Sequence, residues 1–357
     1  MKIGILTFPN AISYGAVLQM YALYRAVERM GHNPEVINYQ NAYMKEQKHI
    51  HRPGWVQRIA GKLLHYRMHR KFHRFEKDRM VKYPVSAISD PQKLPELSGR
   101  YKAVICGSDQ VWNPDITGGD LSYFLNFCDA DTHRVSYAPS FGLSEFSEDF
   151  VSSIRGDLEK FHALSARETP GQMLISELTE KDVPLVCDPT FLLSADDWSS
   201  VEEKHPDANG EYIFYYTIRT SAALWKRCKA FAKEKGLKIV VAGGNLLNRW
   251  KEKDDQIRYA VDVGPEEWLY LLHHARYVFT NSFHGTAFSV NYHKDFYVEF
   301  SSLTNSRLEQ ITMALGLTGQ IVGEASLTGA AVNYSVADHV LAQMRKDSKA
   351  YLMNALQ

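Results

Sequence analysis

Several features that mark whole classes of protein are missing from this sequence of 357 residues. No stretch approaches the roughly 20 consecutive apolar residues that a membrane-spanning helix needs, and the apolar run at the N-terminus is too short for a signal peptide. The 41 Lys and Arg residues are balanced by 41 Asp and Glu residues, which argues against a general nucleic-acid binder. We therefore expect a cytoplasmic protein that does not bind nucleic acid.

Cysteine is scarce, and three common fingerprints are absent. The four cysteines, Cys106, Cys128, Cys187 and Cys228, are scattered without a CxxC pair. This argues against a disulfide scaffold or a zinc site and favours buried free thiols in a reducing compartment. The absence of GxGxxG, GxxxxGK[ST] and GxSxG counts against a nicotinamide-binding fold, a P-loop and a hydrolase nucleophile elbow.

The chain does contain enough apolar sequence for two domains, since 45% of its residues are hydrophobic. An apolar strand at residues 2–7 is followed by helical spacing over 17–30 and a short strand at 34–38. This strand–helix–strand opening is typical of a parallel α/β sheet. Further strands are predicted at 101–109 and in HRVSYAP, LSARE and PLVCDP, with a helix near 148–161.

A polar stretch at 202–211 is typical of a linker, and a second series of alternating strands and helices follows it. Strands are predicted in EYIFYYTI, LKIVVAGGN, ARYVFTN and DFYVEF, and helices at 224–235, from Gly264, and in HGTAFSVNY. We predict an α/β protein with two Rossmann-like domains facing each other across a cleft. The predicted domains cover residues 1–205, residues 206–330, and a helical tail at 331–357 for which packing on the N-terminal domain is one arrangement.

A basic segment at about residues 45–82 interrupts the first domain. It holds twelve Lys and Arg residues, three Asp and Glu residues and five histidines, with an approximate helical stripe of apolar residues. Surface helices with a solvated basic face are the simpler interpretation. A platform for anionic lipid or a phosphorylated acceptor is the alternative.

The stretch FTNSFHGTAFSVNY, residues 279–292, places a histidine where a strand turns into a helix. We expect the strand to end at Asn281 and the helix to begin at Ser282 or Phe283, so that His284 lies in the first helical turn. Such a terminus attracts phosphate or carboxylate groups, and a histidine there can donate a proton to a bound anion. The alternative is a histidine that caps the helix or lies in the core. Glycine-containing turns after other predicted strands, at 107–109 and 243–245, add weaker support for a ligand-binding site at the strand ends.

Eight stretches, in order over roughly residues 1–318, together resemble the polysaccharide pyruvyl transferase family. They are SYGAVLQMYAL, CGSDQVWNP, SYAPSFG, SARE, CDPTFLL with the following Trp198, GPEEWLYLL, TNSFHGTAFSVNYHKDF and NSRLEQITMALGL. The resemblance implies a glycosyltransferase-B-like fold and transfer of the enolpyruvyl unit of phosphoenolpyruvate onto two hydroxyls of a sugar. The product is a pyruvate ketal, and neither a metal nor an organic cofactor is expected. The implied setting is the synthesis of a bacterial exopolysaccharide or capsule.

The resemblance also implies roles for individual residues. His284 matches the family's proposed general acid. Some members have Arg-Leu-His where this chain has Ser282-Phe283-His284, so the cation that binds the donor is unassigned here; Arg219 is the first candidate and Arg307 the second, with an ion pair as the alternative for each. The remaining donor-side candidates are Ser282, Gly285, Thr286, Gly243, Gly244 and Asn305.

Asp109 is the predicted acceptor-side carboxylate, either as a base or as a hydrogen-bond acceptor for a sugar hydroxyl. The alternative is a turn aspartate that binds local backbone N–H groups. The other acceptor-side candidates are Tyr14, Gly15, Ser108, Gln110, Trp112 and Asn113, of which Trp112 could equally pack in the core. Asp188 and Arg167 are predicted to be structural.

The expected partners are phosphoenolpyruvate and a sugar acceptor, for which a lipid-linked oligosaccharide at the cytoplasmic membrane face would suit the basic segment. Two other functions stay open on the sequence. One is a glycosyltransferase of the same fold that uses a nucleotide sugar, and the other is a glycan-binding protein without catalytic activity.

Overall fold

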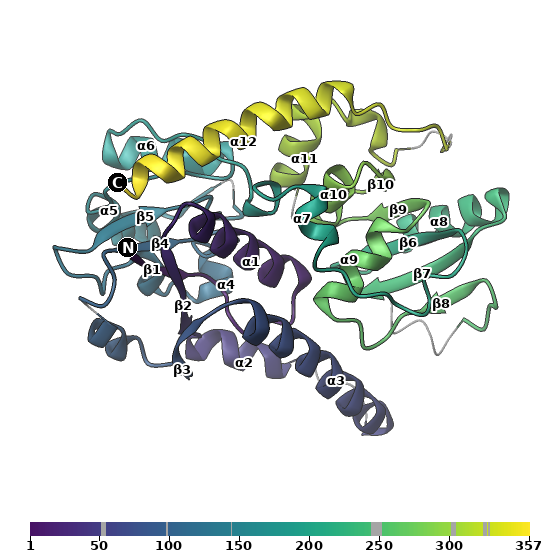
Figure 1. Cartoon of the computed structure of the whole chain (residues 1–357), viewed down its shortest axis with the longest axis horizontal. Coiled ribbons are helices and arrows are strands. Elements are labelled where there is room, and N and C mark those ends of the chain that lie inside the picture. Colours follow the sequence, from purple (N-terminus) through teal and green to yellow (C-terminus); the bar gives the residue numbers. More distant parts are fainter. Residues whose placement is uncertain are drawn as a thin grey trace. The chain divides into compact units, whose positions relative to one another are not determined.

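The structure is a computed structural model that describes residues 1–50, 55–97, 99–143, 145–243, 252–300, 305–323, 327 and 329–357, with the backbone alone at 47–50, 55–65, 305 and 306. The chain divides into two compact units (Figure 1). The first comprises Met1–Lys62, Phe72–Leu192 and Gln343–Gln357, and the second comprises Leu63–Lys71 and Leu193–Ala342.

The first unit is built on a parallel sheet of five strands in the order β3-β2-β1-β4-β5. The strands are β1 (Lys2–Leu6), β2 (Asn33–Tyr39), β3 (Lys82–Ile88), β4 (Ala103–Cys106) and β5 (His133–Ser136). β1 and β4 are buried along almost their whole length, as expected for parallel strands covered on both faces.

Helices and short 3-10 turns surround this sheet. They are α1 (Tyr14–Arg29), α2 (Ala42–Ile50), α3 (Trp55–Arg79), η1 (Pro91–Leu97), α4 (Pro114–Thr117), η2 (Leu121–Phe124), α5 (Glu148–Leu158), α6 (Thr169–Thr179) and η3 (Pro189–Phe191). α1 packs on β2 and η3 and begins directly after the loop that leaves β1. The end of α12 (Ser335–Ala355) also belongs to this unit, where the Tyr351 hydroxyl donates to the Ser136 carbonyl at 2.7 Å.

The second unit repeats the architecture with the strand order β10-β9-β6-β7-β8, again all parallel. The strands are β6 (Tyr212–Thr217), β7 (Lys238–Gly243), β8 (Ile257–Tyr259), β9 (Tyr277–Thr280) and β10 (Asp295–Val298). Its helices are α7 (Ala195–Ser199), α8 (Ala222–Lys235), α9 (Pro265–His273), α10 (Phe283–Asn291), α11 (Asn305–Ala314) and η5 (Thr318–Gln320). α8 packs on β7 and β9, while α10 packs on β9, β10 and α9.

Each unit has its own hydrophobic core. Both cores contain large aromatic side chains: Trp112, Tyr123 and Phe141 are buried in the first unit, and Tyr215 and Phe279 in the second. Such rings bury about 150–250 Å² each and therefore contribute much of the hydrophobic stabilisation. The prediction of an α/β fold with two Rossmann-like sheets is confirmed.

Some sequence predictions need correction. The predicted strand at 101–109 is shorter, since β4 covers only Ala103–Cys106. LSARE and PLVCDP are joined by an isolated β-bridge between Ala166 and Leu185 and are not strands. The polar stretch at 202–211 lacks helix and strand as expected of a linker, but His205 is buried and Glu202 is largely so.

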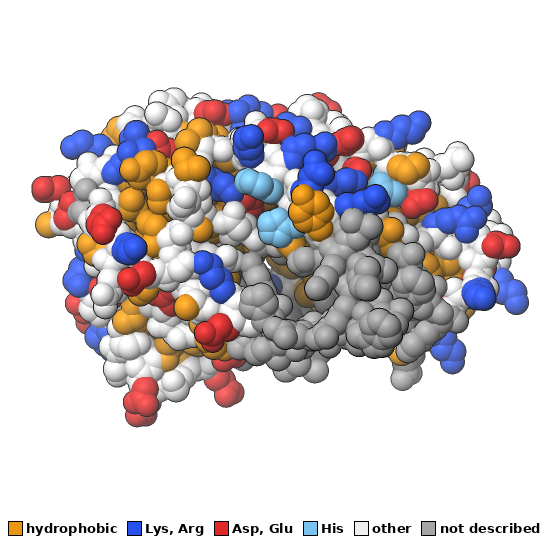
Figure 2. All heavy atoms as spheres, turned by 90° about the horizontal axis from the view of Figure 1, so that it is seen from below, with side chains coloured by type: hydrophobic (Ala, Val, Ile, Leu, Met, Phe, Trp, Pro, Cys, Tyr) orange, Lys and Arg blue, Asp and Glu red, His pale blue; other side chains and the backbone are white. Residues whose placement is uncertain are grey.

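The surface carries charges of both signs. On the face drawn in Figure 2, the Lys and Arg side chains of the described residues are interspersed with Asp and Glu over most of the area. Within the described part of the chain, no helix is both long and apolar enough to span a bilayer.

Candidate functional site

The second sheet has a topological switch point between β6 and β9. From β6 the chain continues to β7 on one side, whereas β9 is followed by β10 on the other. In open parallel sheets, ligands bind outside the carboxyl ends of the strands at such a point. Thr217 and Thr280 are the last residues of β6 and β9, so the loops that follow them form the edge of the sheet that we call the second-unit edge.

His284 lies at this edge. α10 begins at Phe283, as the sequence predicts, and the Ser282 hydroxyl caps it by accepting the Gly285 N–H at 3.2 Å. His284 is the second residue of the helix, beside the N–H groups of the first turn and the positive end of the helix dipole. Its side chain is half-buried, and the Nε2 atom of its ring is itself buried.

Gly285 permits the close approach of α10 to the end of β9. A Cβ atom at this position would lie 2.3 Å from the Thr280 hydroxyl oxygen and 3.2 Å from the Tyr216 ring. The Thr280 hydroxyl itself accepts the Ser282 N–H at 3.0 Å. The position of the first turn of α10 is therefore set by direct packing on β9.

Asn281 joins the loops that follow β9 and β6. Its Oδ1 atom accepts the Ile218 N–H at 3.0 Å, and its Nδ2 atom donates to the Arg219 carbonyl at 2.9 Å. Asn281 is 4% exposed, so these bonds are sheltered from water. The sequence pattern indicated Asn281 only as the end of the strand. Its position directly before a helix cap is the signal that points to a structural role.

Two buried hydroxyls near this edge have no hydrogen-bond partner within the described part of the chain. They are Thr217 Oγ1 and Thr286 Oγ1, on side chains that are each 1% exposed. Buried polar atoms are nearly always hydrogen-bonded in native proteins. Tyr216 is also buried, which raises the pKa of its phenol, while a hydrogen bond with Ser282 lowers it. The edge is consequently rich in hydroxyl groups that could bind an anion.

The other donor-side candidates differ in their surroundings. Arg219 is exposed in the loop after β6, whereas Arg307 is 9% exposed on α11, which packs on α10. Gly243 ends β7 in register with Thr217. Gly244 and the side chain of Asn305 lie outside the described residues.

The first sheet has the matching switch point between β1 and β4, and Ser108 lies directly beyond β4. Ser108 is fully buried: its N–H donates to Gln19 Oε1 at 3.1 Å, and its carbonyl accepts the Thr7 hydroxyl at 3.1 Å. The Ser108 hydroxyl donates to the Ala138 carbonyl at 2.8 Å. These bonds connect the ends of β1, β4 and β5, which indicates that Ser108 holds this first-unit edge together.

Asp109 follows with a positive φ of 72° and is partly exposed. Aspartate tolerates this left-handed conformation better than most residues. Asp109 Oδ1 accepts the Gln110 N–H at 2.8 Å, and the Asp109 carbonyl accepts the Ser140 N–H at 2.9 Å. One carboxylate oxygen thus has the local backbone contact expected of a turn aspartate, on a side chain that solvent can still reach.

A buried ion pair supports the first-unit edge. Arg167 Nη1 lies 2.8 Å from Asp188 Oδ2, and Asp188 Oδ2 is 3.5 Å from the Ser108 hydroxyl. Burial alone would lower the pKa of Arg167, but the carboxylates of Asp188, Glu168 and Asp109 raise it above its ordinary value. Arg167 is therefore charged, and it lies among the carboxylates behind this edge.

The remaining acceptor-side candidates contribute mainly to structure. Trp112 is 1% exposed, stacks on Phe124 at 4.9 Å and donates its indole N–H to the Tyr123 carbonyl at 2.9 Å, which leaves no face for a sugar. Asn113 caps α4 and donates to the partly exposed Gln110 at 2.9 Å. Tyr14 and Gly15 are buried at the start of α1.

Comparison with known families identifies the chain. The family model of polysaccharide pyruvyl transferases matches residues 14–298, which include Ser108, Asp109 and His284. The chain belongs to the polysaccharide pyruvyl transferase family. A search of curated protein sequences finds no significant match.

Solved structures share the fold of this family member at low sequence identity. A protein assigned as a UDP-N-acetylglucosamine 2-epimerase from Listeria monocytogenes aligns with a TM-score of 0.57 and 11% identity, covering 99% of this chain and 90% of that one. S. aureus MnaA, solved with UDP, aligns with a TM-score of 0.52 and 13% identity, covering 99% of this chain and 90% of that one. The UDP-GlcNAc 2-epimerase of Neisseria meningitidis, bound to UDP-GlcNAc, aligns with a TM-score of 0.50 and 9% identity, covering 99% of this chain and 94% of that one.

Proposed function

We propose that this protein transfers the enolpyruvyl unit of phosphoenolpyruvate onto two hydroxyls of a sugar, forming a pyruvate ketal during the synthesis of a bacterial surface polysaccharide. Membership of the polysaccharide pyruvyl transferase family supports a transferase that acts on polysaccharide. The observation that carries the proposal further is the half-buried His284 in the first turn of α10.

The second-unit edge suits an anionic donor. Phosphoenolpyruvate carries a phosphate and a carboxylate, and the N-terminus of α10 offers backbone N–H groups and the positive end of a helix dipole. The buried hydroxyls of Thr217 and Thr286 could donate further hydrogen bonds. We propose Arg219 as the cation that this chain uses in place of the family's Arg-Leu-His arginine, with Arg307 as the second candidate. Ser282, Gly285, Gly243, Gly244 and Asn305 remain predicted parts of the donor site.

The chemistry requires an acid close to the donor. His284 would protonate the methylene carbon, which becomes the methyl group and leaves the central carbon electrophilic. One sugar hydroxyl then adds to that carbon, phosphate departs, and the second hydroxyl closes the ketal as the two hydroxyl protons are lost to base. Positioned acid catalysis contributes about 10²- to 10⁴-fold, or roughly 3–5 kcal/mol of the barrier.

We assign the acceptor to the N-terminal half, residues 1–205, and the donor to residues 206–330. Asp109 is the proposed base for a sugar hydroxyl, because its carboxylate is partly exposed on a rigid support. Tyr14, Gly15, Gln110 and Asn113 stay candidates for acceptor contacts. The basic segment at 45–82 would suit a lipid-linked acceptor at the cytoplasmic membrane face.

Incubation of the purified protein with phosphoenolpyruvate and a panel of sugar acceptors tests the proposal. We expect release of inorganic phosphate together with a new pyruvate ketal that NMR detects on the acceptor. His284→Ala should lower turnover at least about 100-fold and leave the circular dichroism spectrum unchanged. His339→Ala, at an exposed histidine of α12, is the control and should keep full turnover.

Other outcomes would redirect the assignment. Near wild-type transfer by His284→Ala would exclude the histidine as the acid. Nucleoside diphosphate release from nucleotide sugars, without any reaction of phosphoenolpyruvate, would favour a glycosyltransferase. Glycan binding that survives His284→Ala, with neither reaction, would favour a non-catalytic protein. An Arg219→Ala variant with unchanged KM for phosphoenolpyruvate and unchanged turnover would remove Arg219 from the donor site.

A further inference from the structure

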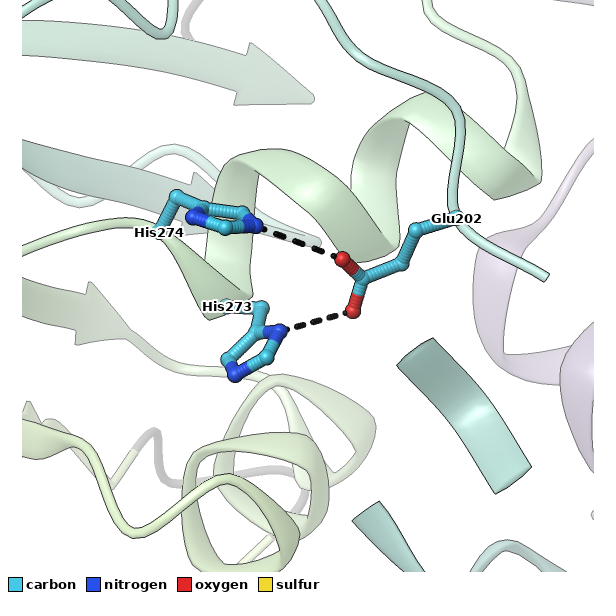
Figure 3. A group of neighbouring side chains, drawn as sticks. All are labelled: Glu202, His273 and His274. Carbon is cyan, nitrogen blue, oxygen red and sulfur yellow. Dashed lines mark hydrogen bonds and ion pairs between the residues drawn. The ribbon is translucent and has the colours of Figure 1, made fainter. Parts of the chain in front are cut away.

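A cluster of two histidines and one glutamate lies in the second unit, at the far end of α9 and α10 from the first turn of α10. Glu202 follows α7, His273 ends α9, and His274 caps it. His273 Nδ1 is 2.9 Å from Glu202 Oε1, and His274 Nε2 is 3.5 Å from Glu202 Oε2. Figure 3 shows both imidazole rings turned toward the single carboxylate.

The three side chains are held in these positions by their neighbours. The His273 ring stacks on Tyr292 at 4.1 Å with an interplanar angle of 9°, and the His274 ring stacks on Tyr270 at 4.0 Å. The Glu202 side chain is only 7% exposed. A set of donors that is already arranged loses little conformational entropy when it binds an ion.

Tyr292 packs directly against this cluster. Its side chain is only 7% exposed. Its ring stacks on His273 at 4.1 Å, and its hydroxyl lies beside the Glu202 carboxylate, so Tyr292 packs against two of the three residues of the cluster. This packing holds the His273 ring and the Glu202 carboxylate in their observed positions.

The geometry points to a divalent transition-metal site, which we propose to be a zinc site formed by His273 Nδ1, His274 Nε2 and a Glu202 carboxylate oxygen. Among the described residues, this is the group of His, Cys, Asp and Glu whose ligand atoms lie together, all within 4.8 Å of one another. Tetrahedral zinc with bonds of about 2.0–2.1 Å separates its ligand atoms by about 3.3 Å. Each imidazole nitrogen is at a comparable distance from one oxygen of the carboxylate, 2.9 Å to Oε1 for His273 and 3.5 Å to Oε2 for His274, so small side-chain shifts would bring three ligand atoms around one ion.

The exposure of the cluster fits three protein ligands and a water. The side chains of His273 and His274 are 33% and 46% exposed, so the remaining coordination position faces solvent. The ion would connect the segment after α7 to the end of α9, and through the His273–Tyr292 stack to the end of α10. His284 lies eight residues before Tyr292, about 12 Å away along α10, so the ion would stabilise that helix without touching the proposed reaction site.

This site departs from the sequence-based expectation that the protein binds no metal. That expectation came from the scattered cysteines and from the family's chemistry. It could not include a pairing of Glu202 with two histidines some 70 residues further along the chain.

Zinc titration of the full-length protein, freed of metal by a chelator and carrying no histidine tag, tests the inference. Calorimetry should give one equivalent of Zn²⁺ bound with micromolar or tighter affinity. Glu202→Gln and His274→Asn should each weaken binding at least about 10-fold. The matched control is His293→Gln, because His293 forms an exposed pair with Asp338 at 2.7 Å but offers only one imidazole; its affinity should stay at the wild-type value.

Two further measurements distinguish this site from zinc binding elsewhere on the protein. Co²⁺ substitution should give tetrahedral visible bands without a sulfur-to-metal charge-transfer band, which would reveal binding at a cysteine. At 100 times the dissociation constant, Zn²⁺ should raise the Tm of the wild type by roughly 5 °C and that of His274→Asn by much less. His274 is the most exposed of the three, so this variant is expected to fold. Unchanged affinity in both ligand variants, or no stoichiometric binding by the wild type, would overturn the proposal.

Discussion

The contact between α10 and β9 predicts a specific response to a single added methyl group at Gly285. The methyl carbon of Gly285→Ala would lie 2.3 Å from the Thr280 hydroxyl oxygen and 3.1 Å from Thr280 Cβ. Ordinary contacts of this kind are near 3.4 Å, so helix and strand must separate by about 1 Å. Thr280 is fully buried, and its hydroxyl accepts the Ser282 N–H, so moving this side chain aside would break that hydrogen bond.

The expected free-energy change follows from two opposing effects. Replacing glycine by alanine within a helix stabilises it by up to about 1 kcal/mol. Overpacking a buried contact costs about 1–3 kcal/mol. We therefore expect Gly285→Ala to lower the free energy of unfolding by about 1–2 kcal/mol. It should also reduce turnover, because the displaced turn carries His284.

A double-mutant cycle isolates the contact. Thr280→Ala removes the obstructing oxygen and also the acceptor of the Ser282 N–H, at a net cost of about 1 kcal/mol. With the oxygen removed, the added methyl group has space, so the double variant should be more stable than the sum of the single effects by at least about 1 kcal/mol. Urea denaturation followed by circular dichroism measures each free energy.

Gly156→Ala is the matched control. Gly156 is also helical, in α5, but a Cβ atom there would have no neighbour within 4 Å. This variant should be stabilised by about 0.5–1 kcal/mol. If Gly285→Ala were stabilised to the same extent, or if the cycle showed no coupling to Thr280, α10 could not be packed on β9 as described.

Two further predictions concern buried charge and pH. Arg167→Met should lower the free energy of unfolding by about 3–5 kcal/mol in urea denaturation, because it leaves the Asp188 carboxylate buried without its cation. The control is Arg276→Met, which removes the cation of an exposed pair and should lower the free energy of unfolding by less than about 1 kcal/mol. Equal losses in the two variants would contradict the role of burial. Burial lowers the pKa of His205, whose Nδ1 accepts the Asp207 N–H at 3.2 Å. The folded state therefore binds a proton at His205 less readily than the unfolded state does. As a result, His205 does not reduce the free energy of unfolding above about pH 6.5, but reduces it increasingly as the pH falls below that value. His205→Asn keeps an acceptor but does not titrate, so its unfolding free energy should vary less between pH 7 and 5 than that of the wild type; equal slopes would refute this.

The features predicted well from the sequence depend on neighbours along the chain. The start of α10 and the position of His284 in its first turn follow from a continuous stretch: an apolar strand, then Asn281 and Ser282, then a helix-forming run. Strand periodicity and helix caps act over a few residues, so they are visible without knowledge of tertiary packing. The parallel α/β class follows from the same local patterns.

The features that the sequence left open or did not reveal depend on residues that are distant in sequence. Trp112 follows a strand in a loop, where an aromatic ring can face solvent or the core, and only the presence of Phe124 and Phe141 around it decides between them. The polar stretch at 202–211 has the composition of an exposed linker. Yet Glu202 and His205 are sheltered, because α9 and neighbouring segments supply partners that composition does not reveal.

The contacts among Ser108, Asp188 and Arg167 show why a purely structural interpretation of Asp188 and Arg167 is incomplete. Arg167 and Asp188 were predicted to be structural, and their burial agrees with that. However, Asp188 also approaches the Ser108 hydroxyl, and Arg167 is close enough to Asp109 for that carboxylate to raise the pKa of the guanidinium. The buried guanidinium of Arg167 therefore lies close to Asp109, the proposed base, as well as in the ion pair with Asp188.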